Sequence, residues 1–410
     1  MNKKIGNIFK GDKVIWMVFF FLCMISIVEV FSASSNLTYK SQNYMGPIVF
    51  HTVTIILGAV VAVVTLNIPC RYFKLMTPFL LFLTIILLLW VLATGEKTGD
   101  ASRWINIFGL TFQPSEIAKG TVVLATAQIL SAMQRENGAD KKAFKYILCI
   151  VAPIAVLIML ENLSTAVLLC SVVFLMMFIG RVPLIQLGKL AGVVVGLALV
   201  GLLLILAVGN DNNVTVDKAK TEVSAPKEKS KIEKLLHRAD TWKSRIKKFS
   251  NKEVITPDKY DLDKDAQVAH ANIAIVSSNI IGKGPGQSVE RDFLSQAFSD
   301  FIFAIVIEEL GIVGASFVVL LYIVLLYRTA RIASKCENNF PAFLAMGLAL
   351  LLVIQAAFNM LVAVGIAPVT GQPLPLISKG GTSTIINCAY IGVILSVSRS
   401  AKKRLPKIAE

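Results

Sequence analysis

Three acidic side chains lie in an otherwise hydrophobic stretch of the sequence. In QAFSDFIFAIVIEELG, residues 296–311, Asp300, Glu308 and Glu309 stand among Phe, Ile, Val and Ala. An ionisable group at membrane depth costs about 2.5–3.5 kcal/mol on insertion scales, so each instance points to a function. On a helix, Glu308 is offset from Asp300 by about 80°, so both can face one interior cavity while Glu309 faces elsewhere. A helix cap is the alternative role for Asp300.

A second hydrophobic stretch contains basic as well as acidic side chains. In RWINIFGLTFQPSEIAK, residues 103–119, Glu116 and Lys119 are three residues apart, so they share a helix face and can pair. One interpretation is a helix that carries this ion pair and whose first amides are capped by Ser115 and Glu116. The other is that Lys119 and Arg103 hold an anion, because a guanidinium matches phosphate oxygens in a bidentate manner. Arg103 beside Trp104 also fits an anchor at the membrane interface.

Two Gly-rich turns contribute further cations. Lys283 lies in GKGPG, residues 282–286, whose amides could face an anion, although such a turn without a preceding strand is mostly just a loop. Lys379 lies in GQPLPLISKGG, residues 371–381, where a re-entrant backbone is tolerated only if it lines protein or a water-filled cavity. Carboxylates among these cations suit a lipid-linked phosphate or pyrophosphate substrate. A transporter would also need an anion site.

Long hydrophobic segments must position these residues. The 410 residues are 55% hydrophobic with a mean hydropathy of +0.69, which is too apolar for a soluble globular protein. We predict an all-α polytopic membrane protein, a single domain over residues 1–410, with about ten transmembrane helices of about 20 residues each. The fifth and sixth almost touch, so they form a tight hairpin or one interrupted pair. The spans are expected near 14–33, 48–66, 78–94, 114–133, 146–160, 163–180, 186–209, 300–327, 341–366 and 383–398.

The distribution of Lys and Arg predicts the orientation. Basic clusters fall in alternate loops, and cytoplasmic loops are enriched in such residues, so both termini are expected in the cytoplasm. The long loop over about 210–299, between the seventh and eighth helices, then lies outside. Within it, residues 232–249 have apolar side chains near helical spacing, which indicates an amphipathic surface helix or a solvated charged one. The net charge of +15 follows mainly from this topology, and nothing indicates a nucleic-acid partner.

Three long motifs, in order along essentially the whole chain, resemble a known family. RWINIFGLTFQPSEIAK, GKGPGQSVERDFLSQAFSDFIFAIVIEELG and LPLISKGGTS are similar to signature stretches of the bacterial shape, elongation, division and sporulation (SEDS) family. The second motif looks more like the division (FtsW-like) branch than the elongation (RodA-like) branch. Two departures matter: Asn162 stands where the family often has an acid, and Lys379 where many members have an aromatic residue or His.

The resemblance implies a GT-C-like SEDS fold and a peptidoglycan glycosyltransferase. Such an enzyme polymerises lipid II at the outer face of the cytoplasmic membrane, here in septal synthesis with a class B penicillin-binding transpeptidase and divisome proteins. The family's essential aspartate matches Asp300, which would take the proton of the attacking sugar hydroxyl. Fixed cations, or a divalent cation such as Mg²⁺ or Mn²⁺, would stabilise the departing pyrophosphate. The expected substrate-binding residues are Arg103, Gln113, Ser115, Glu116, Lys119, Lys283, Glu308, Glu309 and Lys379.

Two functions of other classes remain open at this point. A lipid II flippase would need polar residues in the inner half of the bundle as well, whereas spans two, three, six and seven are nearly free of charge. A structural scaffold for cell division would leave the buried acids unexplained. The charge distribution therefore favours the enzyme.

Overall fold

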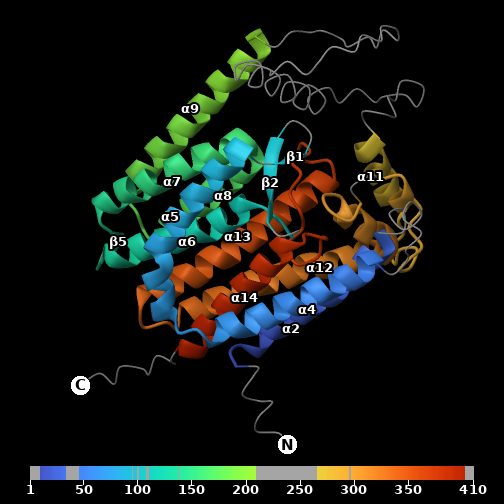
Figure 1. Ribbon diagram of the computed structural model, residues 1–410, viewed down its shortest axis with the longest axis horizontal. Coiled ribbons are helices and arrows are strands. Elements are labelled where there is room, and N and C mark those ends of the chain that lie inside the picture. Colours follow the sequence, from blue (N-terminus) through green and yellow to red (C-terminus); the bar gives the residue numbers. More distant parts are fainter. Residues whose placement is uncertain are drawn as a thin grey trace, which may run out of the picture. The chain divides into compact units, whose positions relative to one another are not determined.

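A computed structural model describes residues 10–33, 46–94, 96–98, 101–107, 110–136, 138–208, 266–294 and 297–401. A helix occupies each of the ten predicted spans (Figure 1). These helices are α2 (Lys13–Ala33), α4 (Gly46–Asn67), α5 (Cys70–Thr94), α6 (Pro114–Ala132), α7 (Lys141–Glu161), α8 (Leu163–Ile179), α9 (Leu184–Val208), α12 (Ile302–Ala333), α13 (Asn339–Ala363) and α14 (Thr382–Ser400). A shorter helix, α11 (Ala266–Ser277), lies within the predicted outer loop.

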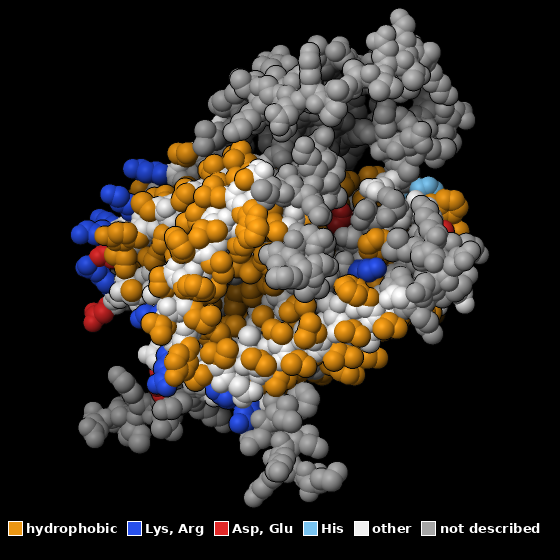
Figure 2. Space-filling model, in the orientation of Figure 1, with side chains coloured by type: hydrophobic (Ala, Val, Ile, Leu, Met, Phe, Trp, Pro, Cys, Tyr) orange, Lys and Arg blue, Asp and Glu red, His pale blue; other side chains and the backbone are white. Residues whose placement is uncertain are grey.

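Six of these helices are long and apolar enough to cross a membrane, namely α2, α4, α5, α7, α12 and α13. Many of their large apolar side chains are exposed; on α5, Leu75 is 74% and Phe82 is 66% exposed. Hydrophobic side chains cover most of the described surface on the face seen in Figure 2. Soluble proteins rarely expose so much apolar surface, so these faces are suited to contact lipid tails. The predicted count of ten transmembrane helices stays a prediction for the other four.

The chain divides into two compact units, residues 1–184 with 261–410, and residues 185–260. Most of α9 belongs to the second unit. In the first unit, α13 packs against α6, α8, α12 and α14, and α4 runs alongside α14 (Figure 1). Buried Leu, Ala and Val side chains line α13 over most of its length, so it lies at the centre of the first unit.

A small β-sheet qualifies the prediction of an all-α protein. Strands β1 (Glu96–Thr98), β2 (Ala101–Ile107) and β3 (Leu110–Phe112) form an antiparallel sheet in the order β1-β2-β3, immediately before α6. A two-residue hairpin, β4 (Gln134–Arg135) and β5 (Gly138–Ala139), joins α6 to α7. The hydrophobicity used to find membrane spans carries no signal for strands this short.

Helix boundaries follow local chemistry that hydropathy alone does not show. α5 begins at Cys70, earlier than the predicted residue 78, and Pro78 lies inside it. α7 begins after Asp140, whose side chain accepts from Lys142 N at 2.9 Å, so polar residues form its first turn. Only Asn162 separates α7 from α8, and its side chain accepts from Thr165 N at 3.3 Å. The two helices pack against each other, which confirms the hairpin rather than one interrupted segment.

Polar contacts gather where the first turns of α6, α8 and α12 meet α13 and the segment after it. Glu116, Lys119, Asp300 and Lys379 lie in this region, whereas Glu308, Glu309 and Lys283 form a separate network with the loop that precedes α12. Asp12, which directly precedes α2, pairs with Arg328 near the end of α12 at 2.8 Å. Asp12 N also donates to Ser398 Oγ near the end of α14. The predicted amphipathic segment 232–249 lies outside the described residues.

Candidate functional site

The predicted pairing of Glu116 and Lys119 is confirmed. Lys119 Nζ lies 2.8 Å from Glu116 Oε1, and both side chains are buried, Lys119 completely. Lys119 Nζ also donates to Gln355 Oε1 on α13 at 2.7 Å. A buried charge is tolerated only when it is paired and hydrogen-bonded, and these two contacts meet that requirement. Whether Lys119 also acts on a substrate anion stays a prediction.

The start of α6 lacks the capping that the sequence predicts. Gln113 occupies the N-cap position without a side-chain hydrogen bond, and Pro114 is the first helical residue. Ser115 Oγ and Glu116 Oε2 are buried, and no described residue bonds either atom. Buried polar atoms are usually paired, so these two oxygens are available to a donor from outside the described chain. Arg103 belongs to strand β2, and its side chain lies outside what the structure describes.

A loop docks into a break in α12. Gly311 has φ 69° and ψ −172° inside this helix, and Gly282 in the GKGPG turn has φ 83°. Each glycine lies against the other's backbone: a Cβ on Gly282 would sit 2.3 Å from Glu309 O, and one on Gly311 would sit 2.3 Å from Ile280 O. Lys283 N and Gly284 N donate to Glu308 O and Glu309 O. The glycines therefore allow the loop to replace helical hydrogen bonds at the break.

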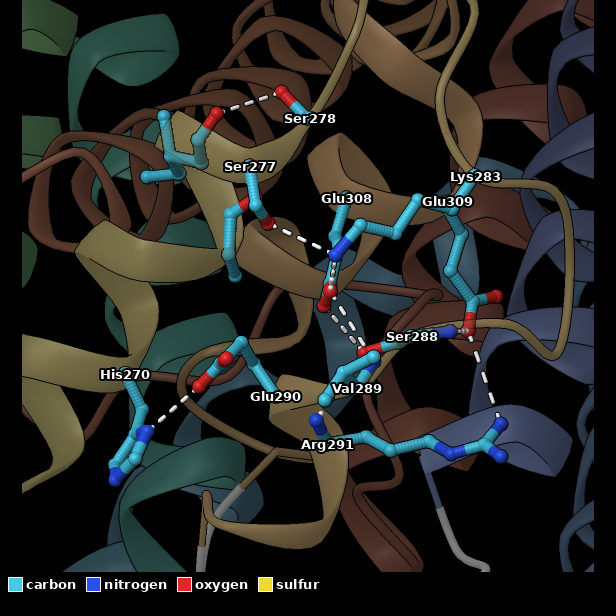
Figure 3. A network of polar contacts seen from close by, with 12 residues as sticks. His270, Ser277, Ser278, Lys283, Ser288, Val289, Glu290, Arg291, Glu308 and Glu309 are labelled. Carbon is cyan, nitrogen blue, oxygen red and sulfur yellow. Dashed lines mark hydrogen bonds and ion pairs between the residues drawn. The ribbon is translucent and has the colours of Figure 1, made fainter.

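Glu308 binds this loop through its side chain (Figure 3). Its Oε1 lies 2.6 Å from Lys283 Nζ and accepts from Val289 N at 3.1 Å, while Oε2 accepts from Ser288 Oγ. Lys283 Nζ also donates to Ser277 Oγ at the end of α11. Glu308 is fully buried.

Glu309 binds the same loop from another side. Gly286 N and Ser288 N donate to its two oxygens at 3.0 and 3.2 Å, and Ser32 Oγ at the end of α2 is a third donor. Arg291 Nη1 lies 4.0 Å from Glu309 Oε1 (Figure 3). It also donates to Ser32 Oγ. All four carboxylate oxygens of Glu308 and Glu309 thus have protein partners. The prediction that these acids bind substrate stays untested, but their contacts already serve to hold the loop.

Asp300 lies in a turn just before α12, so the helical offset predicted between Asp300 and Glu308 does not apply. The helix begins at Ile302 with Phe301 as its N-cap, so Asp300 does not occupy the N-cap position that was its alternative role. Asp300 is half-buried, and its Oδ1 accepts from Ser299 Oγ at 3.0 Å. Its backbone oxygen accepts from Asn359 Nδ2 at 2.8 Å.

Residues 372–379, here called the strap, lie between α13 and α14, where the sequence predicts a polar turn; whether the strap is re-entrant stays a prediction. Four of its carbonyl groups accept hydrogen bonds from helices that surround it, donated by Asn359, Gln355, Tyr322 and Ser26. The strap in turn holds the residues before α12, because Ser378 Oγ donates to Ser299 O at 2.6 Å and Lys379 N to Phe298 O at 2.9 Å. These backbone groups are thereby paired within the protein, which is the condition for irregular backbone at membrane depth.

Lys379 lies at the end of the strap, outside the membrane-spanning helices. Its Nζ is 5.2 Å from the centre of the Phe298 ring, a cation–π arrangement. Burial lowers the pKa of Lys379 from its ordinary value of 10.5. Lys379 therefore contacts the short segment 298–300 that contains Asp300.

Two residues of this network, Gln355 and Asn359, were missed from the sequence. They stand four residues apart in a predicted span that is otherwise apolar, so they share one face of α13. This spacing was the available signal. It shows neither what they contact nor that their partners lie on α6 and in the strap.

The described residues do not contain a group of three or more His, Cys, Asp or Glu side chains placed to hold a metal ion. Glu308 and Glu309 are engaged by Lys283, Ser288 and backbone amides, which does not fit a metal centre. The predicted divalent cation therefore stays a prediction.

Comparisons with known proteins agree with this architecture. The chain is 28% identical over 398 residues to the probable peptidoglycan glycosyltransferase FtsW of Trichlorobacter lovleyi, covering 95% of this chain and 94% of that protein. It is also 28% identical to the peptidoglycan glycosyltransferase MrdB of Escherichia coli K12, with 95% and 94% covered. Both likenesses extend from end to end.

Solved structures share the fold. A chain of a peptidoglycan synthase complex that coordinates polymerization and crosslinking matches with a TM-score of 0.68 and 24% identity, covering 95% of this chain and 98% of that one. The rod shape determining protein RodA of Thermus thermophilus matches with a TM-score of 0.63 and 21% identity, with 97% and 99% covered. The model of the cell cycle protein family FtsW, RodA and SpoVE matches residues 12–403, so this chain belongs to that family.

Proposed function

We propose that the protein is a peptidoglycan glycosyltransferase that polymerises lipid II at the outer face of the cytoplasmic membrane. The observation that carries the proposal is the position of Asp300, which stands outside any helix and is held by Asn359 and the strap beside Lys379. A carboxylate fixed in a polar region at the end of a helix bundle suits proton transfer. The activity named for the relatives needs such a group.

In this mechanism Asp300 acts as general base. The 4-hydroxyl of one saccharide attacks the anomeric carbon of another, its proton passes to the Asp300 carboxylate, and the undecaprenyl pyrophosphate leaves. A neutral hydroxyl is a poor nucleophile, so removing its proton as the bond forms lowers the barrier.

Fixed positive charge would stabilise the pyrophosphate as it departs. Lys119 is already neutralised by Glu116, and Lys283 by Glu308. We therefore assign direct contact with the diphosphate to Arg103 and Lys379, and we assign to Lys119 the role of shaping the electrostatic field of the site. A bound Mg²⁺ or Mn²⁺ would add to the same stabilisation.

The partner and the cellular role follow from the same assignment. A class B penicillin-binding transpeptidase would crosslink the strands that this protein makes, with divisome proteins if synthesis is septal. The form of the 282–303 motif favours the division branch over the elongation branch. We also propose that both termini lie in the cytoplasm, as the distribution of Lys and Arg predicts.

The test is polymerisation of purified lipid II, analysed as glycan chains on a gel, with and without the cognate transpeptidase. We expect chains from the wild-type protein and none from Asp300→Asn, which keeps the size of the side chain but is a far weaker base. The matched control is Asp292→Asn, an exposed acid on the same loop. Near-normal polymerisation by Asp300→Asn would remove Asp300 from the role of base, and lipid II crossing vesicle membranes without polymerisation would favour the flippase.

A further inference from the structure

Asn359 on α13 bridges two backbone segments that meet at the site. Its Nδ2 donates to Asp300 O and to Gln372 O, each at 2.8 Å, so both amide hydrogens are used. Asn359 is 1% exposed. One side chain therefore ties the residue proposed as base to the first residue of the strap.

The orientation of this amide is unambiguous. A flipped amide would point its oxygen at two carbonyl oxygens, which are acceptors only. In the orientation present, Asn359 Oδ1 is buried and no described residue donates to it. An apolar residue could fill this space without leaving a buried acceptor unpaired. The presence of Asn at this position is therefore better explained by the two hydrogen bonds that its amide group donates.

Gln355, one turn earlier on α13, extends the same connection. Its Nε2 donates to Pro373 O in the strap at 3.0 Å, and its Oε1 accepts from Lys119 Nζ at 2.7 Å. Gln372 Nε2 donates to Thr165 Oγ1 at the start of α8. The strap is thus fixed on one side by α13 and α8, and the buried charge of Lys119 lies two hydrogen bonds from it.

Asp300 needs such support because no helix holds it. The turn at residues 298–301 precedes α12, so its position depends on bonds to other elements, and Asn359, Ser378 and Lys379 N supply them. We infer that Asn359 is a positioning residue for the reaction, which fixes the backbone of Asp300 against the strap and so sets where its carboxylate points. The inference rests on the proposed function, because it assigns Asn359 an effect on that reaction.

Asn359→Leu tests the inference, since Leu has the same number of side-chain heavy atoms and the same branching as Asn but is bulkier and has no donor. We expect kcat for lipid II polymerisation to fall about 10–100-fold, because a small misplacement of a catalytic group has that effect. KM should stay within about threefold, since substrate contacts are unchanged. The acid limb of the pH–rate profile should also move, because Asp300 changes its surroundings. Asn359→Gln, which keeps an amide on a longer side chain, should retain more of the rate than Asn359→Leu.

Thr329→Val is the matched control. Thr329 is a fully buried polar residue on α12 whose hydroxyl donates to Leu325 O within its own helix, remote in sequence from residues 298–301. We expect wild-type kcat and an unmoved acid limb from this variant. The inference is wrong if Asn359→Leu keeps wild-type kcat, or if its rate falls only in step with its melting temperature while the acid limb stays in place.

A second measurement separates the inference from the proposed function. Wild-type protein that makes no glycan from lipid II would refute the function. Hydrogen–deuterium exchange at residues 297–303 would then test the bridge alone: faster exchange there in Asn359→Leu, and not in Thr329→Val, supports it. Equal exchange in the two variants would overturn it.

Discussion

Single residues show why a charge at membrane depth need not face a ligand. The sequence spacing of Glu116 and Lys119 predicted their pairing, because residues three apart share a helix face. The spacing could not predict Gln355, which is 236 residues away from Lys119 and completes the environment of its ammonium group. Local geometry is readable from sequence, whereas partners on other helices are set by packing.

Removing Lys119 should therefore destabilise the protein. In Lys119→Met, Glu116 loses its buried partner, and breaking such a pair costs about 3–5 kcal/mol. The double variant Lys119→Met with Glu116→Gln should recover most of that loss, as a thermal unfolding series in detergent would show. If Lys119→Met unfolds at the wild-type temperature but no longer binds lipid II, Lys119 contacts the substrate instead.

Among the elements, α12 departs most from its expected form. The sequence correctly indicated a turn at the GKGPG glycines. It could not indicate that the turn docks into α12, because neither the left-handed φ of Gly311 nor its contact with Gly282 is visible in a hydrophobic pattern. Strands β1–β3 were missed for a similar reason, since they are too short for such a pattern.

Gly311→Ala should loosen the docked loop. An alanine at this position would have to keep φ 69° and ψ −172°, a backbone region that is essentially restricted to glycine and costs about 1–3 kcal/mol. Its Cβ would also collide with Ile280 O. Gly286→Ala is the control, because its φ is 80° but no atom lies within 4 Å of the new Cβ. We expect faster hydrogen–deuterium exchange over residues 278–288, and weaker polymerisation, in Gly311→Ala than in Gly286→Ala. Equal exchange in the two would mean that the contact between the glycines adds nothing to the strain.

At the scale of the whole molecule, composition and periodicity were sufficient to place ten helices. They did not reveal that α13 is central, because a helix that is apolar on all sides looks alike whether it faces lipid or protein. The Asp12–Arg328 pair was equally hidden, since it joins residues 316 apart in sequence.

This pair predicts a pH dependence of stability. Burial raises the pKa of Asp12, but hydrogen bonds from Arg328 and the backbone, with the charge of Arg328, outweigh that effect and lower the pKa below the ordinary 3.8. A lowered carboxyl pKa stabilises the folded protein above the unfolded pKa, and that contribution is lost as pH falls through the folded value. Asp12→Asn should therefore unfold more easily than wild type at neutral pH, by about 1 kcal/mol or less. The difference should vanish well below pH 3.8; a difference that persists there would assign it to something other than this charge.

The single-residue link between α7 and α8 has a consequence for biosynthesis. α8 has 17 residues, about 26 Å of helix, which is short of the roughly 30 Å hydrocarbon core. With only Asn162 between the two helices, neither can be threaded through the translocation machinery alone. We expect the ribosome to deliver them as one inserting hairpin, in which α7, with 21 residues, is long enough to span the bilayer and carries the shorter α8 with it.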